Sequence, residues 1–270
     1  FLLMDLQHRG LTQAAARLLN DYLELTGDYA GLPLLPFYLL YRAMVRAKVC
    51  AIRFSQSDIG QEEAETVLDE YRRYLDLAES VTSQPSAALL LTHGVSGSGK
   101  SRVAGWLSEQ LLAIRIRSDV ERKRLFPGTD AQARARRYAS TATATTYAHL
   151  QGMARWLLRA GFAVIIDATF LKQSQRQPFF ALAEALDTPL LILSCQGSEA
   201  IIRERLVRRA AAGGDPSEAD LSVLTMQLSQ QEPLSEPERR HTILIDSEDF
   251  PPSGMMATVL QRLMEQVSTP

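Results

Sequence analysis

The amino-acid sequence predicts an α/β fold in which a helical segment precedes a domain built on a five-stranded parallel sheet. From residue 87 onward, short apolar runs alternate with helical stretches, which is typical of parallel strands covered by helices on both faces. A glycine-rich octapeptide joins the first apolar run to the first helical stretch. Residues 1–83 show no convincing strand pattern. We therefore expect two domains, residues 1–83 and 84–270.

The first domain is expected to be all-helical. Apolar residues at helical spacing predict helices over 11–25, 37–54 and about 61–81. The inward face of the second helix is predicted to carry Leu40, Met44, Val45, Val49 and Ile52.

The second domain is expected to alternate between the two element types. Strands are predicted over 87–93, 112–117, 162–167, 190–195 and 241–246. Helices are predicted over 101–111, about 131–160, 174–187, 199–212, 218–231 and near 255–267.

The composition is that of a globular protein, with 46% hydrophobic and 22% charged residues and a net charge of −2. No apolar run approaches the roughly 20 residues that a membrane span needs. Cys50 and Cys195 lie far apart and fit no metal spacing, so we expect reduced, buried thiols in a cytoplasmic protein. The chain starts with an apolar segment and no initiator methionine, so we expect it to be the C-terminal part of a longer protein.

The octapeptide Gly-Val-Ser-Gly-Ser-Gly-Lys-Ser, residues 94–101, fits the phosphate-binding pattern G-x-x-x-x-G-K-[ST]. Its glycines let backbone N–H groups converge on phosphate oxygens, and the helix that follows favours an anion at its N-terminus. We expect Lys100 to contact the outer phosphates and the Ser101 hydroxyl to ligate magnesium. A glycine turn that only links two elements is the alternative. The predicted nucleotide contacts are Gly94, Val95, Ser96, Gly97, Ser98, Gly99, Lys100, Ser101 and Arg102.

Asp119 is our candidate for a general base, because ligands of such sheets bind at the carboxyl ends of the strands. It follows the second predicted strand. Phosphoryl transfer to an alcohol needs a carboxylate that orients the hydroxyl and accepts its proton. Ser118 or Asp119 would also serve as the N-cap of a helix over 120–125, and the two interpretations are compatible.

Asp167 follows the third predicted strand, where nucleotide sites place the carboxylate that organises magnesium. We expect it to share the metal with Ser101; an Asp that caps the turn is the alternative. Mechanical ATPases commonly place a water-activating Glu at the next position, which is Ala168 here, so a transferase is favoured over a motor. Thr169 is a candidate contact of the substrate or of the metal-bound water.

Arg122 belongs to a basic run beside Asp119. Its planar guanidinium is suited to a phosphate or carboxylate on the acceptor, whereas a solvated helix face is the alternative interpretation.

Four arginines share the helix predicted over 199–212, which a glycine-rich segment, residues 213–216, follows. They are Arg203, Arg205, Arg208 and Arg209. A mobile segment that lays arginines over the triphosphate would neutralise developing charge and exclude water. A plain amphipathic helix packed on the sheet is the alternative. Arg205 and Arg209 are the leading candidates for this catalytic role.

From Leu89 to about Asp246 the chain resembles P-loop kinases of the group that includes polynucleotide 5′-kinases, gluconate-type sugar kinases and zeta-toxin-like kinases. The matching segments are the octapeptide, residues 118–122, residues 164–169 and the arginine-rich helix over 203–209. The resemblance implies ATP as the nucleotide, Asp119 as base or acceptor ligand, and lid arginines on the phosphates.

Residues 1–83 resemble the last helices of an aminoglycoside-phosphotransferase-like domain, in segments 1–6, 22–28 and 41–48. Bacterial proteins that fuse such a domain to a P-loop kinase-like module show this arrangement. The H-x-D catalytic loop of that family would precede residue 1, so we expect no aminoglycoside kinase activity from this chain.

These inferences combine into an ATP- and magnesium-dependent phosphotransferase with sheet order 2-3-1-4-5. Its expected acceptor is a hydroxyl of a small or nucleotide-like molecule; a nucleic-acid 5′ end stays open, and no membrane partner is expected. The alternative is an ATP-binding regulatory module, a slow NTPase that controls a fused or partner domain. An enzyme needs a concavity between Asp119, Arg122 and the γ-phosphate, whereas a sensor needs none.

Overall fold

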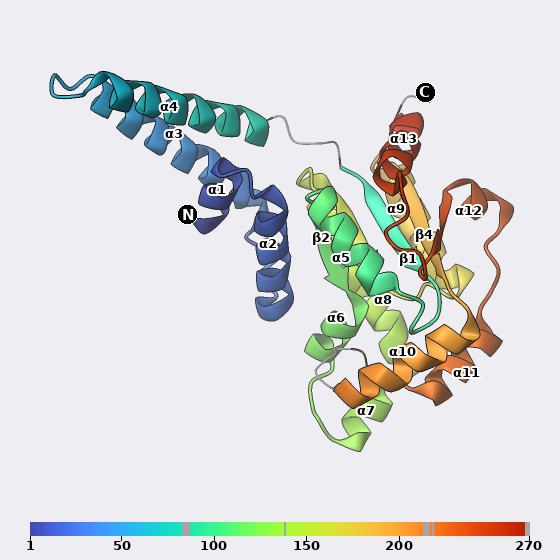
Figure 1. Cartoon of the computed structure of the whole chain (residues 1–270). Helices are drawn as coiled ribbons and strands as arrows, with labels where there is room; N and C mark the ends of the chain where they lie inside the picture. The colour runs from blue at the N-terminus through green and yellow to red at the C-terminus, as the bar shows by residue number, and fades with distance from the viewer. Residues whose placement is uncertain (83–86, 138, 213–216, 218, 268–270) are drawn as a thin grey trace. The chain divides into compact units, whose positions relative to one another are not determined.

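The computed structural model describes residues 1–82, 87–137, 139–212, 217 and 219–267. Contacts within the chain divide it into two compact units, Phe1–Ser86 and Ala87–Pro270 (Figure 1). Both cysteines are buried free thiols, as expected. None of the helices in the described ranges is long and apolar enough to cross a membrane.

The first unit is helical in its described residues. Its elements are α1 (Leu2–His8), α2 (Thr12–Thr26), the 3₁₀ turn η1 (Leu32–Leu34), α3 (Leu35–Phe54) and α4 (Gln61–Thr82). Helices α3 and α4 form a long hairpin, and the core between them also contains Met4 of α1. The short helix α1 was not predicted.

The predicted inward face of α3 is wrong in part, since Leu40 packs against the core of this unit but three other residues of that face do not. The buried residues of this helix are Leu39, Ala43, Ala47 and Cys50. Met44, Val49 and Ile52 are exposed instead. Small side chains at four-residue spacing let α4 approach closely, so Ala43 and Ala47 are buried where the prediction had larger apolar residues.

The second unit is built on a five-stranded parallel sheet in the order β2-β3-β1-β4-β5, which confirms the predicted order. The strands are β1 (Leu89–His93), β2 (Ile114–Arg117), β3 (Val164–Asp167), β4 (Leu190–Gln196) and β5 (Thr242–Asp246). The first three begin two residues later than predicted, because the apolar pattern continues back into the buried residues Ala88, Ala113 and Phe162, which precede the ladders.

The helices of this unit are α5 (Lys100–Gln110), α6 (Ser118–Leu125), α7 (Ala131–Arg137), α8 (Ser140–Arg159), α9 (Gln173–Ala185), α10 (Glu199–Ala212), α11 (Leu221–Gln230), α12 (Glu236–Arg240) and α13 (Met255–Val267). The single helix predicted over 131–160 is therefore wrong. Ala139 has an extended backbone with ψ of 151° and is the N-cap of α8, so α7 and α8 are separate. The five-residue helix α12 was not predicted.

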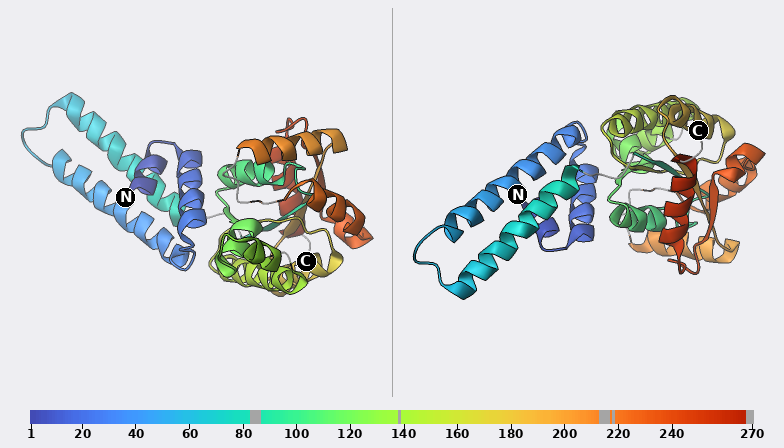
Figure 2. Two further views of the ribbon diagram at one scale, coloured as in Figure 1. Left: turned by 90° about the horizontal axis from the view of Figure 1, so that it is seen from below. Right: turned by 90° about the horizontal axis from the view of Figure 1, so that it is seen from above.

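Helices cover both faces of the sheet. Leu90, Leu191 and Leu193 pack with α5 and α13 on one face. Because successive strand residues point to opposite faces, the other face is buried under α8 and α9 (Figure 2). All strands run in one direction, so their carboxyl ends meet at a single edge of the sheet.

Candidate nucleotide and acceptor site

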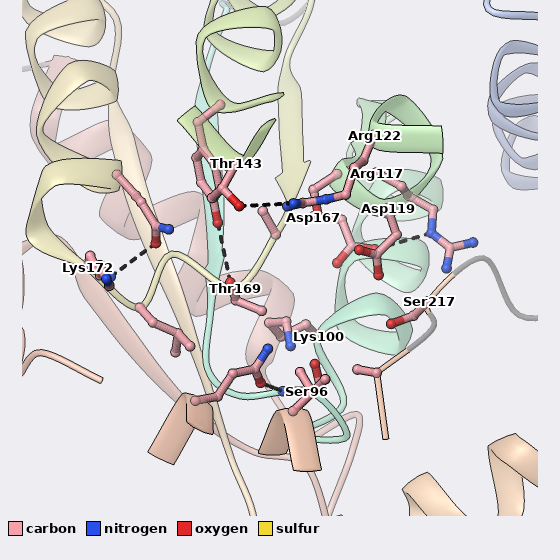
Figure 3. A pocket seen from close by; sticks show the side chains of 18 of the residues that line it. Ser96, Lys100, Arg117, Asp119, Arg122, Thr143, Asp167, Thr169, Lys172 and Ser217 are labelled. Atoms are coloured by element: carbon pink, nitrogen blue, oxygen red, sulfur yellow. Dashed lines mark hydrogen bonds and ion pairs between the residues drawn. The ribbon is translucent and has the colours of Figure 1, made fainter. Parts of the chain in front are cut away.

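A cavity of about 880 Å³ lies at the carboxyl ends of the strands. The octapeptide, α10 and α11 line one part of it, and α6, α8 and the start of α9 line the other (Figure 3). The volume falls in the range of small-molecule sites. One concavity therefore contains the phosphate-binding motif and the predicted acceptor residues.

The octapeptide turns sharply between β1 and α5. Gly99 has a φ of +91° and is the N-cap of α5, and a Cβ at this position would lie 2.7 Å from Ser247 Cβ. Only glycine fits this close approach without strain. No side chain caps α5, which keeps the first N–H groups of the helix available to an anion.

The predicted nucleotide contacts divide into two groups. Those that line the cavity are Ser96, Gly97, Gly99, Lys100, Ser101 and Arg102. Gly94, Val95 and Ser98 instead support the loop from behind. A Cβ on Gly94 would lie 2.6 Å from the Cys195 carbonyl oxygen, Val95 is buried in an apolar cluster, and Ser98 is also buried.

Lys100 folds back on the loop. Its Nζ donates a hydrogen bond to the Val95 carbonyl oxygen at 2.7 Å. Burial lowers the pKa of Lys100, and the charge of Asp167 opposes that shift. The ammonium therefore lies inside the loop, where a bound phosphate would meet it.

Asp167 ends β3 as a buried carboxylate. Its Oδ2 has no hydrogen-bond partner, and Arg117 Nε lies 3.7 Å away. Burial raises the pKa of Asp167, whereas Arg117, Lys100 and the Ser101 hydroxyl favour its ionised form. A buried oxygen without a partner beside a hydroxyl is a donor set that suits a hard cation such as magnesium.

Asp119 is half-buried in the first turn of α6 and lines the cavity. The N-cap of α6 is Arg117, and no side chain makes a capping hydrogen bond, so the alternative role of Ser118 or Asp119 as the cap is wrong. The Asp119 carboxylate is therefore not the N-cap of α6, and capping does not compete with a contact to the acceptor.

Arg122 is buried in the cavity wall, so the solvated-face interpretation is wrong for this residue. Its Nη1 donates to the Arg137 carbonyl oxygen at 2.9 Å and to Thr143 Oγ1 at 3.2 Å. These bonds hold the Arg122 guanidinium, which comes from α6, against the end of α7 and the first turn of α8.

Thr169 lines the cavity and contacts Tyr147, with 3.3 Å between their hydroxyl oxygens. The Tyr147 hydroxyl also accepts a hydrogen bond from the Phe170 backbone N–H at 3.2 Å. Thr143, Tyr147 and Gln151 share one face of α8 at four-residue spacing and line the acceptor part of the cavity. This face was not predicted, because polar residues occur throughout the first half of α8 and do not mark one side of the helix.

Of the four arginines on α10, Arg205 and Arg209 line the cavity. Arg205 donates to Ser247 Oγ at 2.7 Å and to the Ser247 carbonyl oxygen at 2.9 Å. Arg209 donates to the Ala219 carbonyl oxygen at 2.8 Å. Arg203 pairs with Glu199 outside the cavity, at 2.6 Å. The segment 213–216, expected to be mobile, lies outside the described residues.

Curated relatives occur in mycobacteria. Proteins of Mycobacterium bovis and Mycobacterium tuberculosis, each described as uncharacterized, are 31% identical to this chain over 220 residues. The matched region covers 80% of this chain and 43% of each relative. The chain thus spans less than half the length of the curated relatives that it matches.

A solved structure with a TM-score above 0.5 shares the fold of the second unit. Chaetomium thermophilum Kti12 in complex with ADP-AlF3 matches with a TM-score of 0.51 and 18% identity, over 67% of this chain and 100% of that chain. An unliganded sugar kinase from Janibacter sp. matches with a TM-score of 0.48 and 22% identity, over 69% of this chain and 100% of that chain.

A family model matches most of the second unit. The AAA_33 family, described as an AAA domain, matches residues 89–234, which are just over half of the chain. The match contains the octapeptide, Asp119 and Asp167. This chain therefore belongs to the AAA_33 family of AAA domains.

Proposed function

We propose that this chain is an ATP- and magnesium-dependent phosphotransferase that moves the γ-phosphate to a hydroxyl of a small or nucleotide-like acceptor. The observation that carries the proposal is the shared cavity, which joins Lys100 and the loop to Asp119, Arg122 and Thr169. The Kti12 structure was solved with ADP-AlF3, which supports a nucleotide as the ligand of this fold.

In this proposal the loop backbone and Lys100 hold the triphosphate, with the helix N-terminus contributing partial positive charge. Ser101 and Asp167 would hold magnesium. The buried Asp167 Oδ2 without a hydrogen-bond partner supports that assignment, because a hard cation would supply the missing contact. Magnesium supplies charge neutralisation at the phosphates when it is bound.

Asp119 would orient the acceptor hydroxyl and take its proton. The acceptor oxygen then forms a bond to the γ-phosphorus while the bond from that phosphorus to the β–γ bridging oxygen breaks, which leaves ADP. Arg122 and Thr169 would position the acceptor, and Arg205 and Arg209 would neutralise charge that develops on the phosphoryl group.

The alternative, an ATP-gated regulatory module, has no need for the acceptor part of the cavity. The face of α8 that carries Thr143, Tyr147 and Gln151 forms a polar wall beyond the loop. Such a wall favours an acceptor molecule over a slow NTPase. Ala168 places an alanine, not a carboxylate, directly after Asp167, which further argues against water activation at this position.

The proposal is tested by transfer of label from γ-labelled ATP to a polar metabolite extract supplemented with 5′-hydroxyl oligonucleotides. We expect the wild-type protein to label an organic product and Asp119→Asn to lose this product while it still binds ATP. Asp187→Asn, a matched change in an exposed turn, should leave the product unchanged. Label that appears only as inorganic phosphate, at one slow rate in all three proteins, would instead establish the regulatory module.

A further inference from the structure

Gln227 on α11 contacts the phosphate-binding loop directly. Its Oε1 accepts a hydrogen bond from the Ser96 backbone N–H at 2.7 Å. The same side chain lines the cavity together with Gly97 and Lys100. Figure 3 shows this bond as the dashed line that ends at Ser96, just below Lys100.

Apolar packing anchors α11 beside the loop. Leu224 is fully buried in a cluster with Val95 of the loop and with Ile202 and Leu206 of α10. Leu224 and Gln227 are three residues apart and therefore lie on the same face of the helix. The packing that buries Leu224 thus holds Gln227 over the Ser96 N–H.

The orientation of the Gln227 amide follows from its partner. A backbone N–H only donates, so the amide oxygen must face Ser96 and the NH₂ group must face away from that N–H. In the part of the chain that the structure describes, no residue accepts a hydrogen bond from Gln227 Nε2. The amide therefore brings two N–H donors to the cavity at the loop.

We propose that Gln227 contacts the outermost phosphate of the bound triphosphate. Its Oε1 stays on the Ser96 N–H, and its Nε2 donates to a phosphate oxygen. The inference rests on the proposed function only for the triphosphate in the loop and is independent of transfer to an acceptor. Because ADP lacks that phosphate, Gln227 favours ATP over ADP.

Gln227→Glu separates this contact from a purely structural role. The carboxylate keeps an oxygen for the Ser96 N–H but replaces the two donors by a negatively charged acceptor that repels phosphate. Magnesium–ATP and magnesium–ADP affinities are measured by calorimetry for the wild type, Gln227→Glu and Gln227→Leu. We expect Gln227→Glu to weaken ATP at least about tenfold and ADP less than about threefold, since a charge-assisted hydrogen bond is replaced by repulsion.

Gln230→Glu is the matched control. Gln230 lines the same cavity on the same helix, and its replacement by Glu introduces the same charge. It should change the ATP and ADP affinities alike. Gln227→Leu, which removes the donors without adding charge, should weaken ATP by a smaller factor than Gln227→Glu.

Three results would overturn the inference. A Gln227→Glu protein that binds ATP as the wild type does shows no phosphate contact, and equal losses for ATP and ADP show that Gln227 only holds the loop. A wild-type protein that binds neither nucleotide overturns the proposed function and this inference together. Absence of acceptor labelling with intact ATP binding defeats only the proposed function, and the affinity comparison still decides this inference.

Discussion

At the scale of single residues, the charged side chains around the phosphate-binding loop favour the binding of an anion. The Lys100 ammonium is buried and donates to the Val95 carbonyl oxygen, and the Asp167 carboxylate lies among the charges that influence it. Arg117 in turn approaches Asp167. A phosphate that enters the loop brings negative charge to an ammonium that burial alone disfavours.

Replacing Lys100 tests this arrangement. Lys100→Ala should weaken ATP about 10- to 100-fold, because a charge-assisted contact to phosphate is worth about 1.5–3 kcal/mol. Calorimetric titration with magnesium–ATP measures the loss. Lys172→Ala is the control, since Lys172 is an exposed cation that lines the same cavity. Equal ATP affinity in Lys100→Ala and wild type would contradict the role of the loop.

Asp167→Asn should raise the magnesium concentration needed for half-maximal ATP binding by at least about tenfold, as losses at a metal site commonly do. The amide keeps the size of the side chain but removes the charge that a hard cation needs. Nucleotide binding is followed while magnesium is titrated, with Asp187→Asn alongside. An unchanged magnesium midpoint in Asp167→Asn would show that the carboxylate does not hold the metal.

The loop residues were predictable because a contiguous motif fixes their chemistry. Arg117, Tyr147 and Gln227 were not predictable in the same way. Each of these meets the cavity through tertiary packing of a separate element, and none stands in a local pattern that names its partner. The first residue of α6 was also missed, since Arg117, a poor capping residue, holds the N-cap position of this helix.

At the scale of elements, one buried ion pair joins α9 to α12. Arg176 is fully buried, and its Nε and Nη2 donate to the Glu238 carboxylate at 2.7 and 3.1 Å. Arg176 Nη1 also donates to the Phe170 carbonyl oxygen at 2.9 Å. The pair therefore ties the segment after β3, which carries Thr169, to the C-terminal part of the sheet domain.

Breaking that pair should be costly. Arg176→Met leaves the Glu238 carboxylate buried without its cation, which is expected to lower the free energy of unfolding by about 3–5 kcal/mol. Adding Glu238→Gln should recover part of the loss, because the unpaired charge is then gone. Urea unfolding followed by circular dichroism measures both variants. Additive losses in the double variant would argue that the two side chains act separately.

The long elements were predictable because apolar periodicity extends over several turns or a whole strand. The short helix α12 was not, since its five residues, Glu236–Arg240, are mostly charged and form no apolar face. The division between α7 and α8 was missed because neither glycine nor proline marks the extended position at Ala139.

On the scale of the whole molecule, each of the two units has a hydrophobic core of its own. The helical unit closes around Met4, Ala43 and Tyr74, and the sheet unit around residues such as Leu90 and Val103. Apolar patterning predicted both regions. The order of the strands is set by crossovers that no periodicity records, and the predicted order 2-3-1-4-5 is confirmed.

The buried side chain of His93 in the sheet makes the stability of the fold depend on pH. It ends β1, is buried, and its Nδ1 lies 3.0 Å from Ser194 Oγ on β4. Its Nε2 has no hydrogen-bond partner. Burial, with smaller contributions from Arg176 and Lys100, lowers the pKa of His93 from 6.5 to about 4. The folded protein therefore holds a neutral imidazole at a pH where the unfolded chain is already protonated.

Between pH 6.5 and about 4 the unfolded state binds more protons than the folded state at this residue, so the free energy of unfolding should fall as the pH is lowered. Over this whole pH range, His93 lowers the free energy of unfolding by roughly 3 kcal/mol. His93→Asn, which cannot be protonated and keeps a polar group toward Ser194, should lose this part of the slope. Urea unfolding at pH 7 and pH 5 measures the difference between the two proteins. If the free energy of unfolding changes with pH in the same way in wild type and His93→Asn, the imidazole is not the group that titrates. The acid sensitivity of the fold would then be attributed to its carboxylates.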